Sequence, residues 1–328
     1  MNSSTNKETP IPNVLHTKVI TIEDFVPNHR TDFYLPIAEG ALGIVLHVPF
    51  IVARGAHPGP TLGLTAAVHG NELNGIRIIH SLLKNLDLNS LSGTIICAPI
   101  VSVPAFFMAE RKFSDGVDLN NSFPGKIEGT PSEQYAKAFV DCFLPSLDCL
   151  VDIHTASEGR LNSLYVRVNI ESSEALALAV AFNPDMILNS AGGEATLRNA
   201  ARARGISAIT VEAGNPSVIQ GRMVFAGELG IRSVMAHLNM LNEPLKTVNT
   251  PVVCKSSKWL RTTGGGLLET RFKLLQRIEK DEILLESFDP FGNVTKTYYA
   301  PFDGIVIGMA SNPLAIAGTR YCHLGLLL

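Results

Sequence analysis

The sequence predicts an α/β protein with a mixed sheet flanked by helices, followed by a small all-β domain that resembles a barrel. From about residue 40 to residue 237, short apolar runs alternate with longer stretches of helical periodicity. This alternation is typical of an α/β domain with a largely parallel or mixed sheet. After residue 249 the pattern changes to short apolar runs between glycine and proline turns. With 328 residues, the chain is long enough for one large or two ordinary domains.

The elements of the α/β part are expected in a regular order. Leu73, Ile76, Ile79 and Leu82 recur at helical spacing in the first helix, and the strands are recognised as short runs rich in β-branched residues. We expect strands at residues 43–53, 61–67, 94–100, 149–154, 186–188, 207–211 and 233–236. We expect helices at residues 72–85, 131–143, 172–181, 194–204 and 217–229.

The expected division of the chain has three parts. Residues 1–39 form an N-terminal extension with a polar start, residues 40–248 form the large α/β domain, and residues 249–328 form the small β domain. Turn signals in the last part contain Gly264-Gly265-Gly266, Pro290-Phe291-Gly292 and Pro301-Phe302-Asp303-Gly304. No convincing helix is expected there.

Composition narrows the classes of function. The chain is 46% hydrophobic and 17% charged, with a net charge of −3. This profile is typical of a globular protein. The charge provides no basic field that would attract nucleic acid or an anionic membrane. We therefore expect a small-molecule partner, with no nucleic acid and no membrane.

The cysteines and the N-terminus predict a cytoplasmic location. The five cysteines include no C-x-x-C pair, and several lie in apolar runs, so we expect reduced thiols in the core. Residues 1–10 are polar and lack the apolar segment of a secretory signal. The longest apolar stretch, residues 40–52, is interrupted by His47 and Pro49 and is too short to span a membrane.

The most informative motif follows the apolar run 61–66. His69 and Glu72 lie three residues apart where a strand is expected to end and a helix to begin, so their side chains are neighbours. Such pairs also occur as surface charges or helix caps. An imidazole and a carboxylate provide half of a mononuclear zinc site, which is completed by a third protein ligand and a water. The candidate third ligand is His154, at the end of the apolar run 149–154.

Two carboxylates lie near the ends of expected strands. Glu212 follows the run 207–211, and a carboxylate at the end of a buried strand is unusual unless it has a partner or a catalytic role. At a zinc centre it would act as the general base for the attacking water. Asp152 lies two residues before His154, so both side chains face the same side of a strand. Asp152 is therefore a candidate to accept the second ring N–H of His154.

Arg111 is the candidate electrophilic residue. It lies seven residues before the polar loop that begins at Asp118. A guanidinium close to a polarised carbonyl stabilises the oxyanion of a tetrahedral intermediate. The alternative is a surface salt bridge from Arg111 to Glu110 or Asp115.

Four short motifs occur along the chain in the order His69-Gly70-Asn71-Glu72, Asp118-Leu119-Asn120, Asp152-Ile153-His154-Thr155 and Val211-Glu212-Ala213-Gly214. Together, in this order, they resemble the succinylglutamate desuccinylase/aspartoacylase family, which belongs to the zinc carboxypeptidase-like superfamily. The segment 300–306 resembles the small β-barrel that follows the catalytic domain in bacterial members. The resemblance implies a zinc-carboxypeptidase-like mixed sheet and covers most of the chain from about residue 40 onward.

The family resemblance also implies an activity. One Zn²⁺ per chain would be held by His69, Glu72 and His154, with Glu212 as the base and Arg111 near the oxyanion. The reaction would be hydrolysis of the amide bond of an N-acyl amino acid or a related small N-acylated amine. A broad N-acyl-amino-acid or N-acetyldiamino-acid deacylase fits the sequence better than an aspartoacylase or a succinylglutamate desuccinylase.

One position departs from the family pattern. The family usually has an arginine after Asp-Leu-Asn, and that arginine grips a substrate carboxylate, whereas this chain has Asn121. Either Arg160 or Arg167 supplies the charge, or the substrate has no carboxylate there. The candidate substrate contacts are therefore Asn121, Arg167 and Asn120. Asn120 is equally consistent with a role in shaping its loop.

Two alternative functions stay open. A zinc carboxypeptidase for short peptides would need an arginine to clamp the terminal carboxylate, and Asn121 counts against it. A non-catalytic relative would bind a metal or a small ligand without turnover. The β domain would either cover the cleft or form an interface in a homo-oligomer.

Overall fold

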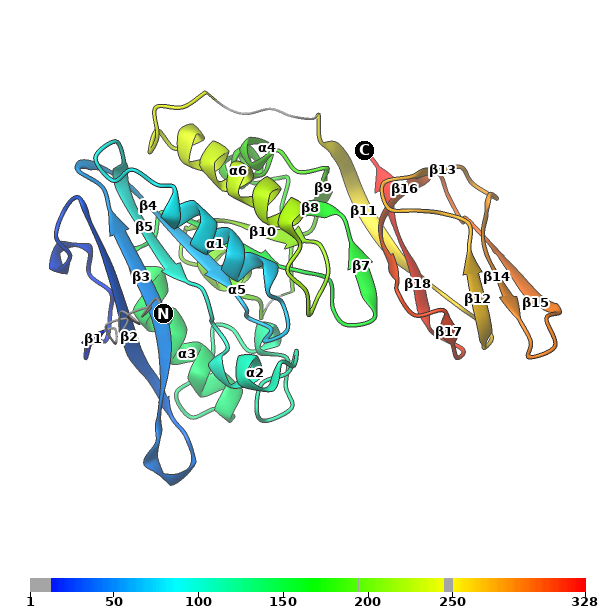
Figure 1. The fold of residues 1–328 in the computed structure, drawn as a ribbon, viewed down its shortest axis with the longest axis horizontal. Helices are drawn as coiled ribbons and strands as arrows, with labels where there is room; N and C mark the ends of the chain where they lie inside the picture. The colour runs from blue at the N-terminus through cyan, green and yellow to red at the C-terminus, as the bar shows by residue number, and fades with distance from the viewer. Residues whose placement is uncertain (1–12, 194, 245–249) are drawn as a thin grey trace, which may run out of the picture.

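A large mixed sheet and a smaller antiparallel sheet organise the chain (Figure 1). The computed structural model describes residues 13–193, 195–244 and 250–328. In these residues the large sheet has fourteen strands, in the order β1-β2-β3-β5-β4-β6-β10-β8-β9-β11-β18-β16-β13, with β7 paired to β16. The second sheet has the order β15-β14-β12-β17. The expected fold class is confirmed.

The strands of the large sheet are β1 (Asn13–Val14), β2 (His29–Glu39), β3 (Val45–Arg54), β4 (His57–Ala66), β5 (Ser92–Ala98), β6 (Cys149–His154), β7 (Arg160–Asn162), β8 (Leu164–Val168), β9 (Met186–Asn189), β10 (Ser207–Ala213), β11 (Val252–Arg261), β13 (Arg277–Ile278), β16 (Gly304–Ala310) and β18 (Arg320–Leu327). The strands of the second sheet are β12 (Gly266–Thr270), β14 (Ile283–Phe288), β15 (Val294–Tyr299) and β17 (Leu314–Ala315). The α-helices are α1 (Asn74–Lys84), α2 (Val103–Met108), α3 (Pro131–Phe143), α4 (Ser173–Phe182), α5 (Leu197–Arg202) and α6 (Gly221–His237).

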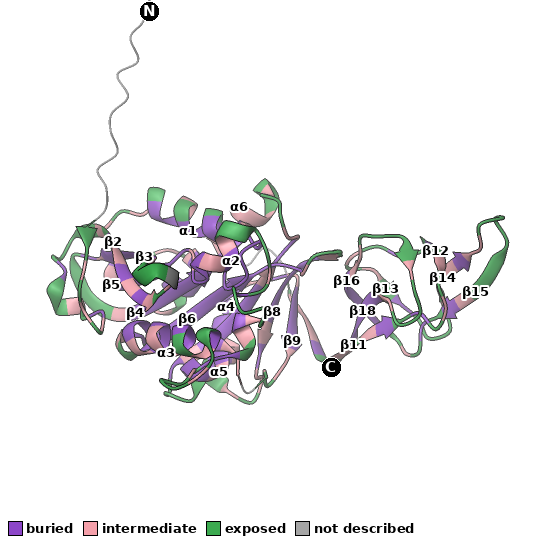
Figure 2. Cartoon of the chain, turned by 90° about the horizontal axis from the view of Figure 1, so that it is seen from below, coloured by how far each residue is buried: buried purple, intermediate pink, exposed green. Residues whose placement is uncertain are grey.

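Helices cover both faces of the large sheet in its first two thirds. Helices α1, α4 and α6 pack into one hydrophobic cluster with the sheet, and α3 and α5 pack into a second cluster on the other face. Figure 2 shows α1 and α6 on one side of the strands and α3 and α5 on the other. Strand β5 contributes Ile95 to the first cluster and Ile96 to the second, because successive side chains of a strand point to opposite faces. Burial on both faces explains the continuous apolar runs of the central strands.

The C-terminal part continues the large sheet. Strand β11 pairs in parallel with β9 and antiparallel with β18, and β16 extends the sheet further. The second sheet packs against these strands over a separate core that includes Leu260, Leu285, Tyr298 and Leu324. Residues 250–328 contain strands and no α-helix, as expected.

One predicted strand is wrong. Residues 233–236 belong to helix α6, which begins at Gly221 and ends at His237. Periodicity alone does not distinguish a short apolar run in a buried helix from a strand. The predicted helix at residues 217–229 therefore begins later and runs further than expected. The start of the predicted helix at residues 194–204 lies outside the described residues, and α5 begins at Leu197.

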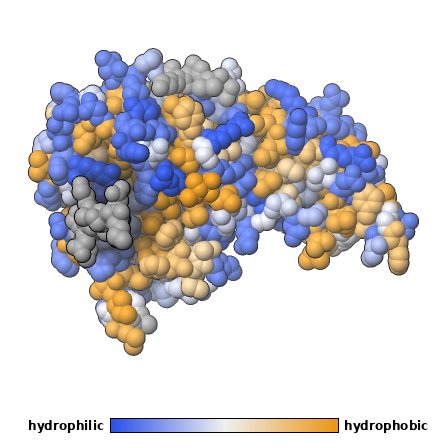
Figure 3. Space-filling model, in the orientation of Figure 1, coloured by the Kyte–Doolittle hydropathy of each residue, from blue (hydrophilic) through white to orange (hydrophobic). Residues whose placement is uncertain are grey.

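Several elements were not predicted. Strand β2 pairs with β3 along ten residues of each strand, although it falls in the segment assigned to the N-terminal extension. The hairpin that these strands form projects from the molecule, and its tip exposes the apolar side chains of Leu42 and Ile44 (Figure 3). Strand β8 and helix α2 were also missed. The polar start at residues 1–10 and the proposed boundary at residues 248 and 249 lie outside the described residues.

Two further observations concern the expected location. All five cysteines are free and buried. Within the described ranges, no helix has the length and apolarity needed to cross a membrane.

Candidate active site

A sharp corner at the end of β4 positions His69 and Glu72. Ala67 has a φ of 50°, which turns the chain out of the strand, and the Glu72 N–H donates to the carbonyl of His69 at 3.1 Å. The corner packs on the backbone of α2 so closely that a Cβ at Gly70 would lie 1.9 Å from the carbonyl oxygen of Ala105. Only glycine fits this contact without a shift of α2. Both side chains are thereby held at the carboxyl end of the central strand.

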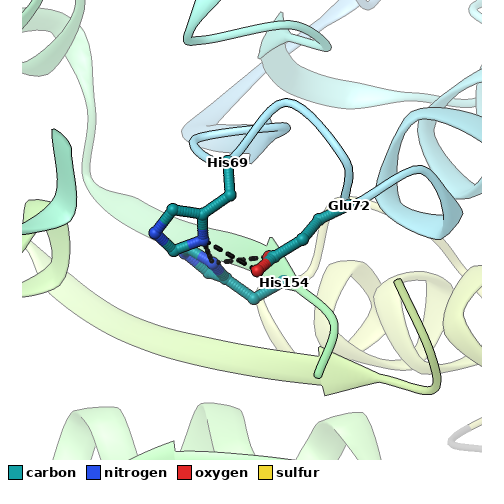
Figure 4. Close-up of side chains that lie close together, drawn as sticks. All are labelled: His69, Glu72 and His154. Carbon is teal, nitrogen blue, oxygen red and sulfur yellow. Dashed lines mark hydrogen bonds and ion pairs between the residues drawn. The ribbon is translucent and has the colours of Figure 1, made fainter. Parts of the chain in front are cut away.

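His69, Glu72 and His154 converge on one point (Figure 4). The Nδ1 atom of His69 lies 2.8 Å from Glu72 Oε1, and Nδ1 of His154 lies 3.0 Å from Glu72 Oε2. The two Nδ1 atoms are 3.3 Å apart. All three side chains are buried, at 4% exposure or less. Two imidazole nitrogens and a carboxylate in this arrangement could hold a metal ion.

A carboxylate holds the outer nitrogen of each histidine. Asp118 Oδ1 lies 2.8 Å from Nε2 of His69, and Asp152 Oδ2 lies 2.9 Å from Nε2 of His154. A neutral imidazole that donates from Nε2 presents the lone pair of Nδ1 to a metal. The contact expected for Asp152 is therefore present. The equivalent contact of Asp118 was not predicted.

The electrostatics of the centre keep its carboxylates ionised. Burial raises the pKa of Glu72, but the charges and hydrogen bonds of His69 and His154 outweigh it and hold the pKa well below its usual range. For Asp118, burial also raises the pKa, and the hydrogen bond of His69 and the charge of Arg111 lower it by more. Glu72 and Asp118 are thus in the anionic form, which pairs with a cation.

Arg111 lies directly against the centre. Its Nη1 donates to Glu72 Oε1 at 3.1 Å and to Ser157 Oγ at 3.0 Å, and its Nη2 lies 2.8 Å from Asp118 Oδ2. The alternative salt bridges to Glu110 and Asp115 are not among its contacts. The Nη1 atom also lies 3.2 Å from Nδ1 of His69, so the Arg111 guanidinium contacts the same two side-chain atoms that face each other in the centre.

Glu212 lies beside the centre on the neighbouring strand. It pairs in register with His154 across β10 and β6. Its Oε1 accepts from Nε of Arg167 at 3.1 Å, and its Oε2 accepts from Nδ2 of Asn162 at 3.2 Å. Arg167 also donates to the Tyr165 hydroxyl at 2.7 Å. Both oxygens of Glu212 are thus fixed in place.

The site opens into a cavity of about 330 Å³. This volume suits a small ligand. Asn120 lines the cavity, and its Oδ1 accepts from the Leu197 N–H at 3.0 Å, which ties its loop to the start of α5. The sequence-predicted residues on the cavity wall are His69, Glu72, Arg111, Asn120, Asn121, His154, Arg160, Arg167 and Glu212.

Among the residues of the cavity wall that sequence reasoning missed are Asn162, Arg198, Trp259 and Arg320. Arg198 is 6% exposed, and its Nη1 has no hydrogen-bond partner among the described residues. Asn162 holds Glu212. Trp259 and Arg320 come from the C-terminal β strands. Trp259 is the one tryptophan of the chain, and this rarity could have identified it as a candidate site residue. No local signal distinguished Arg198 or Arg320 from surface arginines.

Comparison with known proteins identifies the family. A sequence model of the succinylglutamate desuccinylase/aspartoacylase catalytic domain matches residues 58–238, more than half of the chain. The chain belongs to the succinylglutamate desuccinylase/aspartoacylase family. This family consists of hydrolytic deacylases, which supports an enzymatic role, and the resemblance seen in the sequence is confirmed.

A curated relative covers most of the chain. It is the N-alpha-acetyl-L-2,4-diaminobutyric acid deacetylase of Halomonas elongata, 27% identical over 290 residues, which are 83% of this chain and 84% of the relative. The name of this relative describes a deacetylation, which agrees with the matched catalytic-domain model and supports this family member as a deacylase.

Solved structures share the fold over nearly the whole length. A succinylglutamate desuccinylase from Silicibacter sp. has a TM-score of 0.81 at 22% identity, covering 92% of this chain and 95% of its own. A family member from Rhodobacter sphaeroides has a TM-score of 0.81 at 24% identity, covering 91% and 96%. A product-bound ectoine utilization protein from Ruegeria pomeroyi has a TM-score of 0.80 at 24% identity, covering 91% and 95%.

Proposed function

We propose that this family member is a zinc-dependent deacylase that hydrolyses the amide bond of an N-acyl amino acid or a related small N-acylated amine. The observation that carries the proposal is the convergence of His69, Glu72 and His154 beside Glu212 in one cavity. Tetrahedral zinc with bonds of about 2.0–2.1 Å spaces its ligand atoms about 3.3 Å apart. The two Nδ1 atoms are separated by 3.3 Å, and the donor set of two imidazoles and a carboxylate suits zinc.

The metal and the base have separate roles in this proposal. When bound, one zinc ion per chain supplies Lewis acidity and lowers the pKa of water to about 7. Glu212 takes a proton from the attacking water and passes it to the leaving amine. Arg167 and Asn162, which hold the two carboxylate oxygens of Glu212, orient the base.

Arg111 stabilises the charge that develops on the carbonyl oxygen. Its guanidinium is fixed by Asp118 and by Glu72, so it does not need to reorganise during the reaction. The same contacts connect Arg111 to His69 through Asp118, which joins the electrophile and the metal centre in one hydrogen-bond network.

The substrate carboxylate has a candidate partner in Arg198. Among the described residues, Nη1 of the buried Arg198 has no hydrogen-bond partner, and this is unfavourable unless a ligand completes its hydrogen bonds. We assign Arg198 to the carboxylate of the amino acid, and we keep Asn120, Asn121 and Arg167 as further substrate contacts because all three line the cavity.

The five buried free cysteines support our proposal of a cytoplasmic location. We also propose that the chain forms a homo-oligomer, and light scattering would measure the oligomeric state.

Metal content and hydrolysis test the proposal together. The purified protein is expected to hold about one zinc per chain and to release acid from some member of a panel of N-acetyl, N-succinyl and N-formyl amino acids, with loss of activity in chelator. His69→Ala is expected to lose the zinc. Stoichiometric zinc without hydrolysis of any N-acyl amino acid would contradict the deacylase function, and cleavage of short peptides alone would favour a carboxypeptidase.

A further inference from the structure

The segment that follows the metal ligand His154 is bound to a strand of the C-terminal β domain. Strand β7 pairs antiparallel with β16, and Asn162 lies opposite Gly308 in this pairing (Figure 1). Directly after β7, the backbone N–H and the hydroxyl of Ser163 both donate to the carbonyl of Ile307, at 3.1 and 2.9 Å. The chain between the metal centre and β8 is thus held by a strand that lies outside the α/β domain.

Strand β16 has an irregularity at this contact. Its pairing with β18 shifts in register between Val306 and Gly308, so Ile307 lies in a β-bulge. Because Ile307 has no register partner on β18, its carbonyl is free to accept the two donors of Ser163. Bulges are over-represented next to active sites, where they redirect side chains. Here the bulge places Gly308 against Asn162.

Gly308 and Asn162 approach each other too closely for any larger residue at position 308. A Cβ atom on Gly308 would lie 2.5 Å from Oδ1 of Asn162 and 3.0 Å from the carbonyl oxygen of Leu161. Gly308 does not have a positive φ, so its backbone conformation is open to other residues. The glycine is therefore required by the side chain of Asn162, which is buried in the space that a residue with a Cβ would fill.

The other end of the same amide group contacts Glu212. Nδ2 of Asn162 donates to Oε2 of Glu212 at 3.2 Å, and the backbone N–H of Asn162 donates to Oδ1 of Asn215 at 3.3 Å. An ionised carboxylate only accepts hydrogen bonds, so the NH2 end of the amide has to face Glu212 and the oxygen end has to face Gly308. A shift of the amide away from Gly308 would therefore move its donor relative to Glu212.

We propose that Gly308 is a positioning residue for the base: it leaves the space in which the Asn162 amide is held on Glu212. This inference rests on the proposed deacylase function, in which Glu212 is the base. Gly308 does not line the cavity, so it acts through Asn162 and not through the substrate. The β domain thereby has a role in orienting the base, in addition to the two roles expected from the sequence, a cover for the cleft or an oligomer interface.

Kinetics of a glycine-to-alanine variant test this role. Gly308→Ala adds one methyl group, which displaces the Asn162 amide and removes a hydrogen bond to a charged group. We expect kcat to fall about 10- to 100-fold, with KM and zinc content little changed, and Asn162→Ala to show a loss of the same size. Met309→Ala is the control, because Met309 is next on the strand and packs on the core of the β domain. It should lower stability and leave kcat unchanged.

A double variant shows whether Gly308 acts through Asn162. In the Asn162→Ala background the group that the new methyl would displace is gone, so Gly308→Ala is expected to change kcat by less than about 2-fold. If the two losses instead multiply, Gly308→Ala harms the enzyme by another route and the inference is overturned. An unchanged kcat in the single variant Gly308→Ala would overturn it as well.

Crystal structures of the zinc-loaded proteins separate this inference from the proposed function. The wild-type protein is expected to keep the hydrogen bond between Asn162 and Glu212, and Gly308→Ala to lose it. An intact bond in Gly308→Ala would refute the positioning role, and wild-type hydrolysis would leave the deacylase function standing. A wild-type protein that hydrolyses none of the N-acyl amino acids would refute the deacylase function, while a displaced amide in Gly308→Ala would still support the control of Asn162 by Gly308.

Discussion

Glu212 and His154 occupy paired positions on two adjacent parallel strands, β10 and β6. Paired residues of neighbouring strands point to the same face of the sheet, so the proposed base and a proposed metal ligand emerge side by side at the carboxyl edge. In open α/β sheets, ligands bind at this edge. The strand register therefore fixes the spacing between the base and the metal centre without requiring a flexible loop.

The first prediction concerns the base. Glu212→Gln preserves the shape of the side chain and its contact with Arg167 but cannot accept a proton. We expect kcat to fall about 100- to 10,000-fold with zinc retained and KM little changed. Steady-state kinetics and metal analysis check this. Glu158→Gln is the matched control, because Glu158 is exposed outside the cavity. Near-normal kcat in Glu212→Gln with zinc present would remove Glu212 from the mechanism.

The second prediction concerns the support of a ligand. Asp152 accepts from Thr65 Oγ1 at 2.7 Å and lies 2.9 Å from Nε2 of His154. Asp152→Asn keeps the volume but weakens the orientation and basicity of His154, so we expect zinc affinity to fall about 10- to 100-fold. Competition with a chromophoric chelator measures it. Asp148→Asn, at an exposed position just before β6, should leave the affinity unchanged; equal losses in both variants would indicate a general loss of stability.

The parts of the site that the sequence could predict are those with a local signature. His69, Glu72, His154 and Glu212 follow apolar runs, and a strand end is visible in the sequence because burial imposes the run before it. Asp152 could be predicted to lie beside His154 because side chains two residues apart in a strand face the same side of the sheet. These inferences need no knowledge of how distant segments meet.

The parts that could not be predicted depend on tertiary contacts. Trp259 and Arg320 reach the cavity only because β11 pairs with β9 and continues the large sheet. Arg198 is buried because α5 packs on the sheet beside the loop of Asn120. The wrong strand prediction at residues 233–236 has a similar origin. Val234 and Met235 are buried because helix α6 packs against the sheet, and not because they lie in a strand.

The third prediction concerns Arg111. Arg111→Gln removes the charge that faces the developing oxyanion and leaves Asp118 in contact with His69. We expect kcat to fall about 100- to 1,000-fold with about one zinc per chain retained. Lys112→Gln is the control, because Lys112 is exposed at the adjacent position and does not line the cavity. Loss of zinc in Arg111→Gln would instead give Arg111 a role in building the metal centre.

The fourth prediction concerns pH and stability. His323 Nε2 lies 2.8 Å from Ser257 Oγ, and the ring packs against Trp259 and Tyr165 while facing the positive charges of Arg160, Arg167 and Arg320. The pKa of His323 is lowered from 6.5 to about 3 in the folded protein. As the pH falls, His323 therefore binds its proton at a higher pH in the unfolded chain than in the folded protein. His323 consequently reduces stability as the pH falls below about 6.5, and this loss continues until the folded form is protonated near pH 3.

Replacement of His323 by glutamine removes this titration. Wild type and His323→Gln share their other titrating groups, so the difference between their unfolding free energies isolates His323. We expect the variant to be less stable at pH 7, because stacking on Trp259 is lost. Its deficit should shrink by about 2 kcal/mol between pH 7 and pH 5, since each pH unit below the unfolded pKa is worth about 1.4 kcal/mol. Urea unfolding at saturating zinc measures both curves. If the two curves of unfolding free energy against pH were parallel, His323 would be protonated to the same extent in the folded and the unfolded state. That result would contradict a neutral His323 ring beside three arginines.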